Sequence, residues 1–231
     1  PKDLPMKILE RRVYRGPSQY AHFPVMRLTV DLGALEAWPS GKLAGFGAGL
    51  LAALPSLDQH TCSYGVAGGF VRRLTEDGGT WLGHVLEHVA IEVEQLAGAK
   101  VTFGKTRSAG PTGHYHVVYE YEEERVGEAA GDLAHRLIMS LVPTELGGGG
   151  LAEYYARGTR GGVNVAGLPA TEGTGRSPFQ EDLDELITLA QRRQLGPSTS
   201  SLVRAAEARD IPWMRLNDYS LVQFGHGKYQ K

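Results

Sequence analysis

The chain has 231 residues, with 24 Lys and Arg against 26 Asp and Glu, so its formal net charge at pH 7 is −2. Hydrophobic residues make up 42% and charged residues 22%, which is typical of a globular protein and excludes a wholly disordered, collagenous or membrane-embedded chain. The balanced charge gives no reason to expect a nucleic-acid or lipid surface. The single cysteine, Cys62, cannot form an internal disulfide, so a cytoplasmic location is expected.

The first part of the chain mixes strand and helix patterns. Apolar and polar residues alternate in three segments that are expected to be strands, at residues 6–14, 25–32 and 115–122. Apolar residues with helical spacing predict helices at residues 46–54, 81–97 and 126–141, and Thr80 is expected to cap the second of these. Residues 1–146 are therefore predicted to form an α+β domain, with an antiparallel or mixed sheet and helices packed on one face.

The second part begins with a change in composition. Residues 147–180 are rich in glycine, with four in a row at its start, and are expected to be a flexible linker. Residues 181–231 are expected to form a small α/β segment, with helices at 180–194 and 201–209 and two short strands around Asn217 and Asp218. Two helices and two strands bury too little surface to stand alone, so this segment is expected to continue in a longer protein or to pack on the first domain.

The sharpest motif is His84-Val-Leu-Glu-His88, on the helix predicted with most support. His84 and His88 are one turn apart on one helical face, a spacing that allows two imidazoles to hold one Zn²⁺. Glu87 lies at the edge of that face and could take a proton from a water held by the metal. The order H-x-x-E-H matches the inverzincin pattern. Glu92, one turn further along, is better placed to orient an imidazole than to bind the metal directly.

A catalytic zinc site needs a third protein ligand, and the sequence leaves this choice open. His60 is slightly preferred because imidazole suits zinc, and Glu120, in the last strand of the domain, is the alternative. Cys62 is a further possibility as a thiolate, although a lone cysteine is more often a small buried hydrophobe. The opposing interpretation is that the two histidines and the glutamate form only a polar helix face with salt links. The acidic run that includes Glu120 and Glu122 is usually solvated, and it would also suit a guanidinium-rich ligand.

Several longer segments resemble the N-terminal domain of the cyanophycin synthetase family. They are residues 6–10 (MKILE), 60–65 (HTCSYG), 69–74 (GFVRRL) and 79–92 (GTWLGHVLEHVAIE). Residues 195–199 (LGPST), 211–213 (IPW) and 221–225 (LVQFG) resemble the opening of the family's ATP-grasp domain. The resemblance covers nearly the whole chain except its glycine-rich part.

The resemblance implies a function. Family enzymes use ATP and Mg²⁺ to make cyanophycin, a poly-aspartate chain with arginine on each side-chain carboxylate, and they work as tetramers. The N-terminal domain holds the polymer, and in some members a zinc-peptidase-like site cuts it into primers. The residues implied for that site are His84, Glu87 and His88. Arg72 and Arg73, in the third matching segment, are expected to contact polymer together with Glu120 and Glu122.

Two main hypotheses follow for this chain. The first is a zinc-dependent hydrolase that cleaves amide bonds of the polymer, with Zn²⁺ as the cofactor. The second is a non-catalytic module that binds polymer for ligase domains. No ligase activity is expected of the chain by itself, because it stops where the main body of the ATP-grasp domain would begin.

Overall fold

A four-stranded antiparallel sheet underlies the first part of the chain in the computed structural model, which describes residues 5–149 and 177–225. Its strands are β1 (Lys7–Tyr14), β2 (Val25–Asp31), β3 (Gly104–Ser108) and β4 (His114–Glu120). They lie in the order β1-β2-β4-β3, and every neighbouring pair is antiparallel. The predicted α+β class is therefore confirmed, and the sheet is antiparallel rather than mixed.

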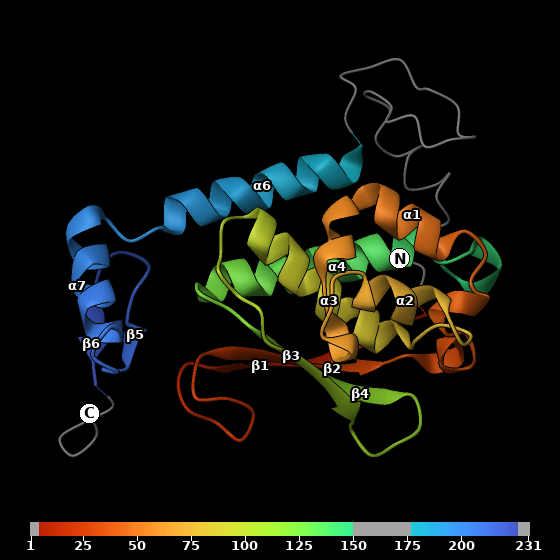
Figure 1. The fold of residues 1–231 in the computed structure, drawn as a ribbon, viewed down its shortest axis with the longest axis horizontal. Coiled ribbons are helices and arrows are strands. Elements are labelled where there is room, and N and C mark those ends of the chain that lie inside the picture. Colours follow the sequence, from red (N-terminus) through yellow and green to blue (C-terminus); the bar gives the residue numbers. More distant parts are fainter. Residues whose placement is uncertain (1–4, 150–176, 226–231) are drawn as a thin grey trace.

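The helices cover one face of this sheet (Figure 1). The α-helices are α1 (Phe46–Ala53), α2 (Gly69–Thr75), α3 (Leu82–Leu96) and α4 (Glu124–Leu141). Short 3₁₀ helices precede α1, connect α1 to α2 and follow α4: η1 (Gly33–Ala37), η2 (Ser40–Lys42), η3 (Pro55–Gln59), η4 (Cys62–Tyr64) and η5 (Thr144–Leu146). Helix α3 contacts β3, β4 and α4, so it lies at the centre of the domain.

The core forms where the sequence pattern places it. The apolar residues of the second predicted strand are all fully buried: Met26, Leu28, Val30 and Leu32. The apolar positions of α4 are also buried, with Val126, Ala130, Leu133, Leu137 and Leu141 each at most 5% exposed. Because side chains alternate across a strand and recur every three to four residues on a helix, these positions define the two surfaces that pack together.

The second part of the chain begins with a long helix. Helix α6 (Pro178–Arg193) packs along α4 and leads to α7 (Pro197–Glu207) and a two-stranded sheet of β5 (Trp213–Arg215) and β6 (Val222–Phe224). Ser177 and Gln180 form a capping box, which starts α6 inside the segment predicted as linker. Residues 150–176 of that predicted linker lie outside the described residues.

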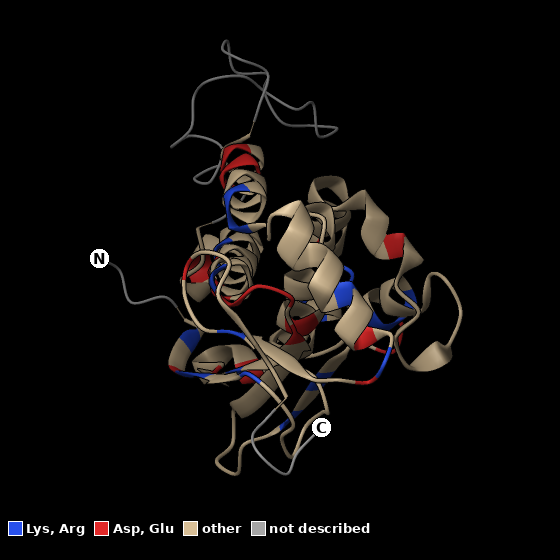
Figure 2. Cartoon of the chain, turned by 90° about the vertical axis from the view of Figure 1, so that its left-hand side faces the viewer, with Lys and Arg blue, Asp and Glu red and all other residues tan. Residues whose placement is uncertain are grey.

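Charged residues do not separate by sign on the surface. In the view of Figure 2, basic and acidic residues are interspersed over the strands and helices. No helix in the described ranges is both long enough and apolar enough to cross a bilayer.

Candidate metal centre

Helix α3 presents two imidazoles toward the segment that precedes it. His84 and His88 lie one turn apart on α3, with ring centroids 4.8 Å apart in an edge-to-face arrangement, and both lie against the ring of Phe70 on α2. His88 is buried at 7% exposure and His84 is half-buried. His84 is therefore the more accessible of the two imidazoles.

Cys62 supplies the third donor atom. Its backbone has a φ of +47°, a left-handed conformation that non-glycine residues adopt rarely and that costs free energy. In this turn, Cys62 Sγ lies 3.5 Å from His84 Nε2. The donor atoms of Cys62, His84 and His88 all lie within 4.8 Å of one another. Within residues 5–149 and 177–225, this is the one group of three or more His, Cys, Asp or Glu side chains with that geometry.

One pair of these donor atoms has the spacing of zinc ligands. In a tetrahedral zinc site, a sulfur ligand at about 2.3 Å and a nitrogen ligand at about 2.0–2.1 Å lie about 3.5 Å apart, which is the distance between Cys62 Sγ and His84 Nε2. Burial and the positive charge of Arg73 lower the pKa of His84 to about 4. Burial and the neighbouring His84 and His60 lower the pKa of His88 to about 2. Both imidazoles are therefore neutral at pH 7, as metal ligands must be.

Thr80 holds the ring of His84 from the opposite side. Thr80 Oγ1 lies 3.0 Å from His84 Nδ1. The prediction that Thr80 caps the helix is wrong, because the N-cap residue of α3 is Trp81 and no side chain caps the helix there. The Thr80 hydroxyl is engaged by the imidazole instead, so Nδ1 of His84 is occupied and Nε2 faces Cys62.

Glu87 precedes His88 on α3, and its carboxylate contacts β3. Its Oε2 accepts a hydrogen bond of 2.5 Å from Thr106 Oγ1, on β3. Burial raises the pKa of Glu87 to about 7, although the Thr106 hydrogen bond and the charge of Arg107 act in the opposite direction. A carboxyl group with a pKa near 7 is suited to accept and release a proton at neutral pH.

His60 contacts His88 and Glu92 and is not part of the donor group. His60 Nδ1 is 3.0 Å from His88 Nδ1, and His60 Nε2 is 2.7 Å from Glu92 Oε2. The second carboxylate oxygen of Glu92 accepts a hydrogen bond from Ser56. Burial raises the pKa of Glu92, but the hydrogen bonds from His60 and Ser56 outweigh it, so the pKa lies below its ordinary value. On the other side, the Phe70 ring stacks on His88 with centroids 4.2 Å apart.

The other predicted site residues lie elsewhere. Glu120 accepts hydrogen bonds from the backbone N–H groups of Thr102 and Phe103, and Glu122 accepts one from Lys100. These two carboxylates therefore hold the loop between α3 and β3 and do not join the cluster.

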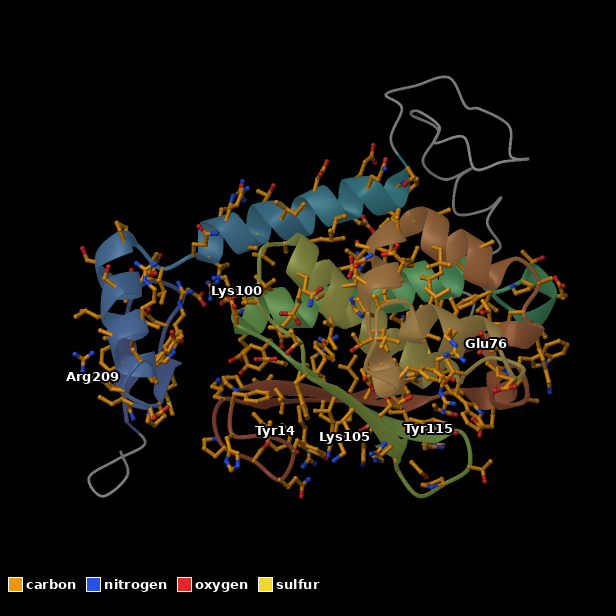
Figure 3. All side chains as sticks on the ribbon, in the orientation of Figure 1. Tyr14, Glu76, Lys100, Lys105, Tyr115 and Arg209 are labelled. Carbon is orange, nitrogen blue, oxygen red and sulfur yellow. The ribbon has the colours of Figure 1, made fainter. Side chains whose placement is uncertain are left out.

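Of the two arginines on α2, Arg72 pairs with Glu76, which Figure 3 labels just after that helix. Arg73 is exposed and its charge acts on His84. The structure thus brings Arg73 near the cluster and leaves Arg72 in a surface ion pair.

Four contributors were not singled out as site residues from the sequence: Ser56, Phe70, Thr80 and Thr106. Thr106 reaches Glu87 from a strand 19 residues later, and Ser56 reaches Glu92 from 36 residues earlier. No local pattern marks contacts over such distances. Phe70 and Thr80 fall inside the matching segments at residues 69–74 and 79–92, which is the only signal that could have drawn attention to them.

Comparison with known proteins identifies the family of the chain. Residues 27–143, about half of the chain, match the family described as the cyanophycin synthase-like N-terminal domain. The cyanophycin synthetases of Crocosphaera subtropica and Synechocystis are 41% and 40% identical over 230 residues, and that of Geminocystis herdmanii is 37% identical over 228 residues. The matches cover 98% of this chain but only 23% of each relative. The chain therefore belongs to the cyanophycin synthase-like N-terminal domain family.

Proposed function

We propose that this chain binds zinc through Cys62, His84 and His88 and hydrolyses amide bonds of cyanophycin, with Glu87 as the general base. The observation that carries the proposal is the cluster of one thiol and two neutral imidazoles, with donor atoms within 4.8 Å of one another. The two imidazoles lie on the same helix as Glu87, a carboxyl whose pKa is raised to about 7. The relatives' name, cyanophycin synthetase, indicates the polymer as the substrate.

Thr106 and Glu87 have separate roles in the proposed hydrolysis. Thr106 holds the carboxylate of Glu87, so that the group is oriented before substrate arrives. Glu87 then takes a proton from the attacking water and delivers it to the leaving amine. A zinc ion, when bound, would supply Lewis acidity and a lowered pKa for a bound water. Cys62, His84 and His88 would hold the ion, and three protein ligands would leave a coordination position open for water or substrate.

Cys62 is the third ligand in this proposal. The sequence alone favoured His60 slightly over Glu120, but neither belongs to the group of donors that can share one ion with His84 and His88. Glu120 accepts hydrogen bonds from two backbone N–H groups. The two ring nitrogens of His60 face His88 and Glu92.

The test is polymer cleavage by the purified, zinc-loaded chain. We expect cyanophycin to be cut, and chelation of the metal to stop the cutting. Glu87→Gln keeps the size of the side chain but not its basicity, so it should abolish cleavage while zinc content stays the same. His116→Gln is the matched control, because His116 contacts Thr29 on the sheet and is not part of the cluster. Cleavage that persists in Glu87→Gln contradicts the role of Glu87 as base.

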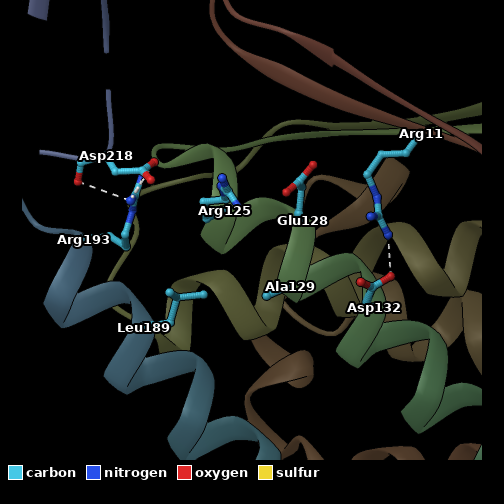
Figure 4. Close-up of a pocket in the computed structure, with 8 residues that line it drawn as sticks. All are labelled: Arg11, Arg125, Glu128, Ala129, Asp132, Leu189, Arg193 and Asp218. Atoms are coloured by element: carbon cyan, nitrogen blue, oxygen red, sulfur yellow. Dashed lines mark hydrogen bonds and ion pairs between the residues drawn. The ribbon is translucent and has the colours of Figure 1, made fainter. Parts of the chain in front are cut away.

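A second candidate function is polymer binding, and one cavity favours it. A cavity of about 370 Å³ lies between β1, α4, α6 and the turn after β5, and three arginines and three carboxylates are among the residues that line it (Figure 4). Arg11 pairs with Asp132 at one side, and Arg193 pairs with Asp218 at the other. The other charged lining residues are Arg125 and Glu128. Neighbouring charges of both signs complement a ligand that carries a carboxylate and a guanidinium in each unit.

Binding and cleavage can be separated by variants. We expect Arg125→Ala combined with Glu128→Ala to weaken binding of zinc-free chain to cyanophycin, measured as the fraction of chain that co-sediments with the polymer. The same variant should retain its zinc. Unchanged polymer binding in this variant would show that the cavity does not bind the polymer. It would not contradict the proposed metal site.

The complete activity of the relatives is proposed only for a longer protein. The chain spans 23% of their length, so we propose that it forms the N-terminal region of a cytoplasmic, tetrameric ATP- and Mg²⁺-dependent ligase. We expect no incorporation of aspartate or arginine when the chain is incubated with ATP, Mg²⁺ and polymer primer.

A further inference from the structure

We propose that Ser56, Glu92 and His60 form a chain of hydrogen bonds that fixes the tautomer of His88, so that His88 presents Nε2 to the metal. The inference rests on the proposed metal site and assigns positioning roles to residues that do not bind the ion.

The chain of hydrogen bonds begins at the carboxylate. The side chain of Glu92 is only 3% exposed, and its two oxygens face Ser56 Oγ and His60 Nε2. An ionised carboxylate only accepts hydrogen bonds. The Ser56 hydroxyl therefore donates to one oxygen, and His60 donates to the other through an Nε2–H group.

The position of the proton on His60 determines the tautomer of His88. A neutral imidazole that carries its proton on Nε2 has a lone pair on Nδ1. His60 Nδ1 lies 3.0 Å from His88 Nδ1, so one of these nitrogens must donate and the other must accept. Because His60 accepts, His88 carries its proton on Nδ1 and keeps a lone pair on Nε2. The side chain of His60 is 11% exposed, which limits competition from water for these bonds.

The same ring nitrogen is occupied in the other histidine. Thr80 engages Nδ1 of His84, and the opposite nitrogen, Nε2, faces Cys62 Sγ. Both histidines of the helix therefore offer Nε2, although different partners hold them. Phe70 stacks on the ring of His88 and restricts its rotation. A histidine whose other nitrogen is fixed by a hydrogen bond is a better metal ligand, because its tautomer and orientation are set before the ion arrives.

Nuclear magnetic resonance of ¹⁵N-histidine-labelled chain tests the tautomers directly. In long-range ¹H–¹⁵N spectra we expect the Nε2–H tautomer for His60 and the Nδ1–H tautomer for His88, in both the metal-free and the zinc-loaded chain. On zinc addition, the Nε2 resonance of His88 should shift strongly, whereas the nitrogens of His60 should keep their tautomer. An Nε2–H tautomer at His88, or direct zinc coordination by His60, would overturn the proposal.

Metal affinity tests the consequence. Competition with a chromophoric chelator should show zinc binding weakened about 10- to 100-fold in His60→Ala and in Glu92→Gln. Both variants should keep one metal per chain, and their cobalt(II) spectra should keep the sulfur charge-transfer band of the wild type. His84→Ala, in contrast, should lose stoichiometric metal, and His116→Gln should bind as the wild type does. Wild-type affinity in both His60→Ala and Glu92→Gln contradicts the proposal.

These measurements do not depend on cleavage. A chain that shows the expected tautomers and affinities but leaves cyanophycin intact would keep the positioning roles and refute the hydrolase. Ser56→Ala removes only the outermost donor and is a milder variant if the others fail to fold; it should weaken zinc binding by a smaller factor than Glu92→Gln.

Discussion

The hydroxyl of Thr106 on β3 donates a hydrogen bond of 2.5 Å to the carboxylate of Glu87 on α3. We predict that Thr106→Val, which keeps the shape but removes the donor, lowers the rate constant for polymer cleavage about tenfold or more, because a hydrogen bond to a charged group is lost. Thr106→Ser should restore most of the rate. Zinc content should be the same in both variants, and a Val variant that cleaves as fast as the wild type contradicts the role of Thr106.

Gly104 gives Glu87 the space it needs. A Cβ atom at position 104 would lie 2.6 Å from both Cγ and Oε1 of Glu87, well inside van der Waals contact. We predict that Gly104→Ala displaces the carboxylate and lowers cleavage at least as much as Thr106→Val does. Gly196→Ala is the matched control, because no atom lies within 4 Å of its added Cβ. Equal cleavage rates for the two glycine variants would show that the position of Glu87 is not critical.

Glu94 is a buried carboxyl group for which the described residues provide no hydrogen-bond partner. Burial, and then the charges of Glu122, Glu120 and Glu123, raise its pKa well above 4.5. The folded chain therefore retains a proton that the unfolded chain releases above about pH 4.5, and the contribution of this group to stability falls as the pH rises.

Glu94→Gln removes that dependence on pH. We predict that its free energy of unfolding, measured with urea, exceeds that of the wild type by more at pH 8 than at pH 5. Because only one proton is involved, the difference in free energy of unfolding between variant and wild type cannot change by more than about 1.4 kcal/mol per pH unit. A difference that shrinks as the pH rises would mean that Glu94 is ionised in the fold.

Arg193 joins the last turn of α6 to the start of α4. Its guanidinium contacts Glu123 at 2.6 Å, and the two side chains are only 15% and 14% exposed. Arg136 and Asp182 also join these helices, but Arg136 is 52% exposed. We predict that Arg193→Met lowers the free energy of unfolding by about 1–3 kcal/mol, whereas Arg136→Met costs less than about 1 kcal/mol. Denaturation in urea compares the two, and equal losses would count against a special role for Arg193.

Much of the fold is predictable because it depends on local patterns. Alternation at residues 25–32 identifies the buried face of β2, and helical spacing identifies the buried face of α4. These patterns do not predict strand β3, because its five residues are mostly polar and it lies at the sheet edge. Helix α2 was also missed, since its seven residues are too few to show a period.

The sequence predicts only those residues of the metal site that lie close together on one helix. His84, Glu87 and His88 follow from spacing on one helix, whereas the partner of each is set by the tertiary fold. Cys62 was given less weight because a lone cysteine is most often a buried hydrophobe, and the sequence does not reveal the left-handed turn that directs its sulfur toward His84. The preference for His60 came from its chemistry alone.

Zinc content per chain is the most direct test of the central claim. The chain is loaded with zinc, freed of excess metal by gel filtration and analysed by elemental analysis, together with His84→Ala and Cys62→Ser. We predict one zinc per wild-type chain, none in His84→Ala and a substantial loss in Cys62→Ser. A wild-type chain without zinc, or a His84→Ala chain that retains it, would contradict the account.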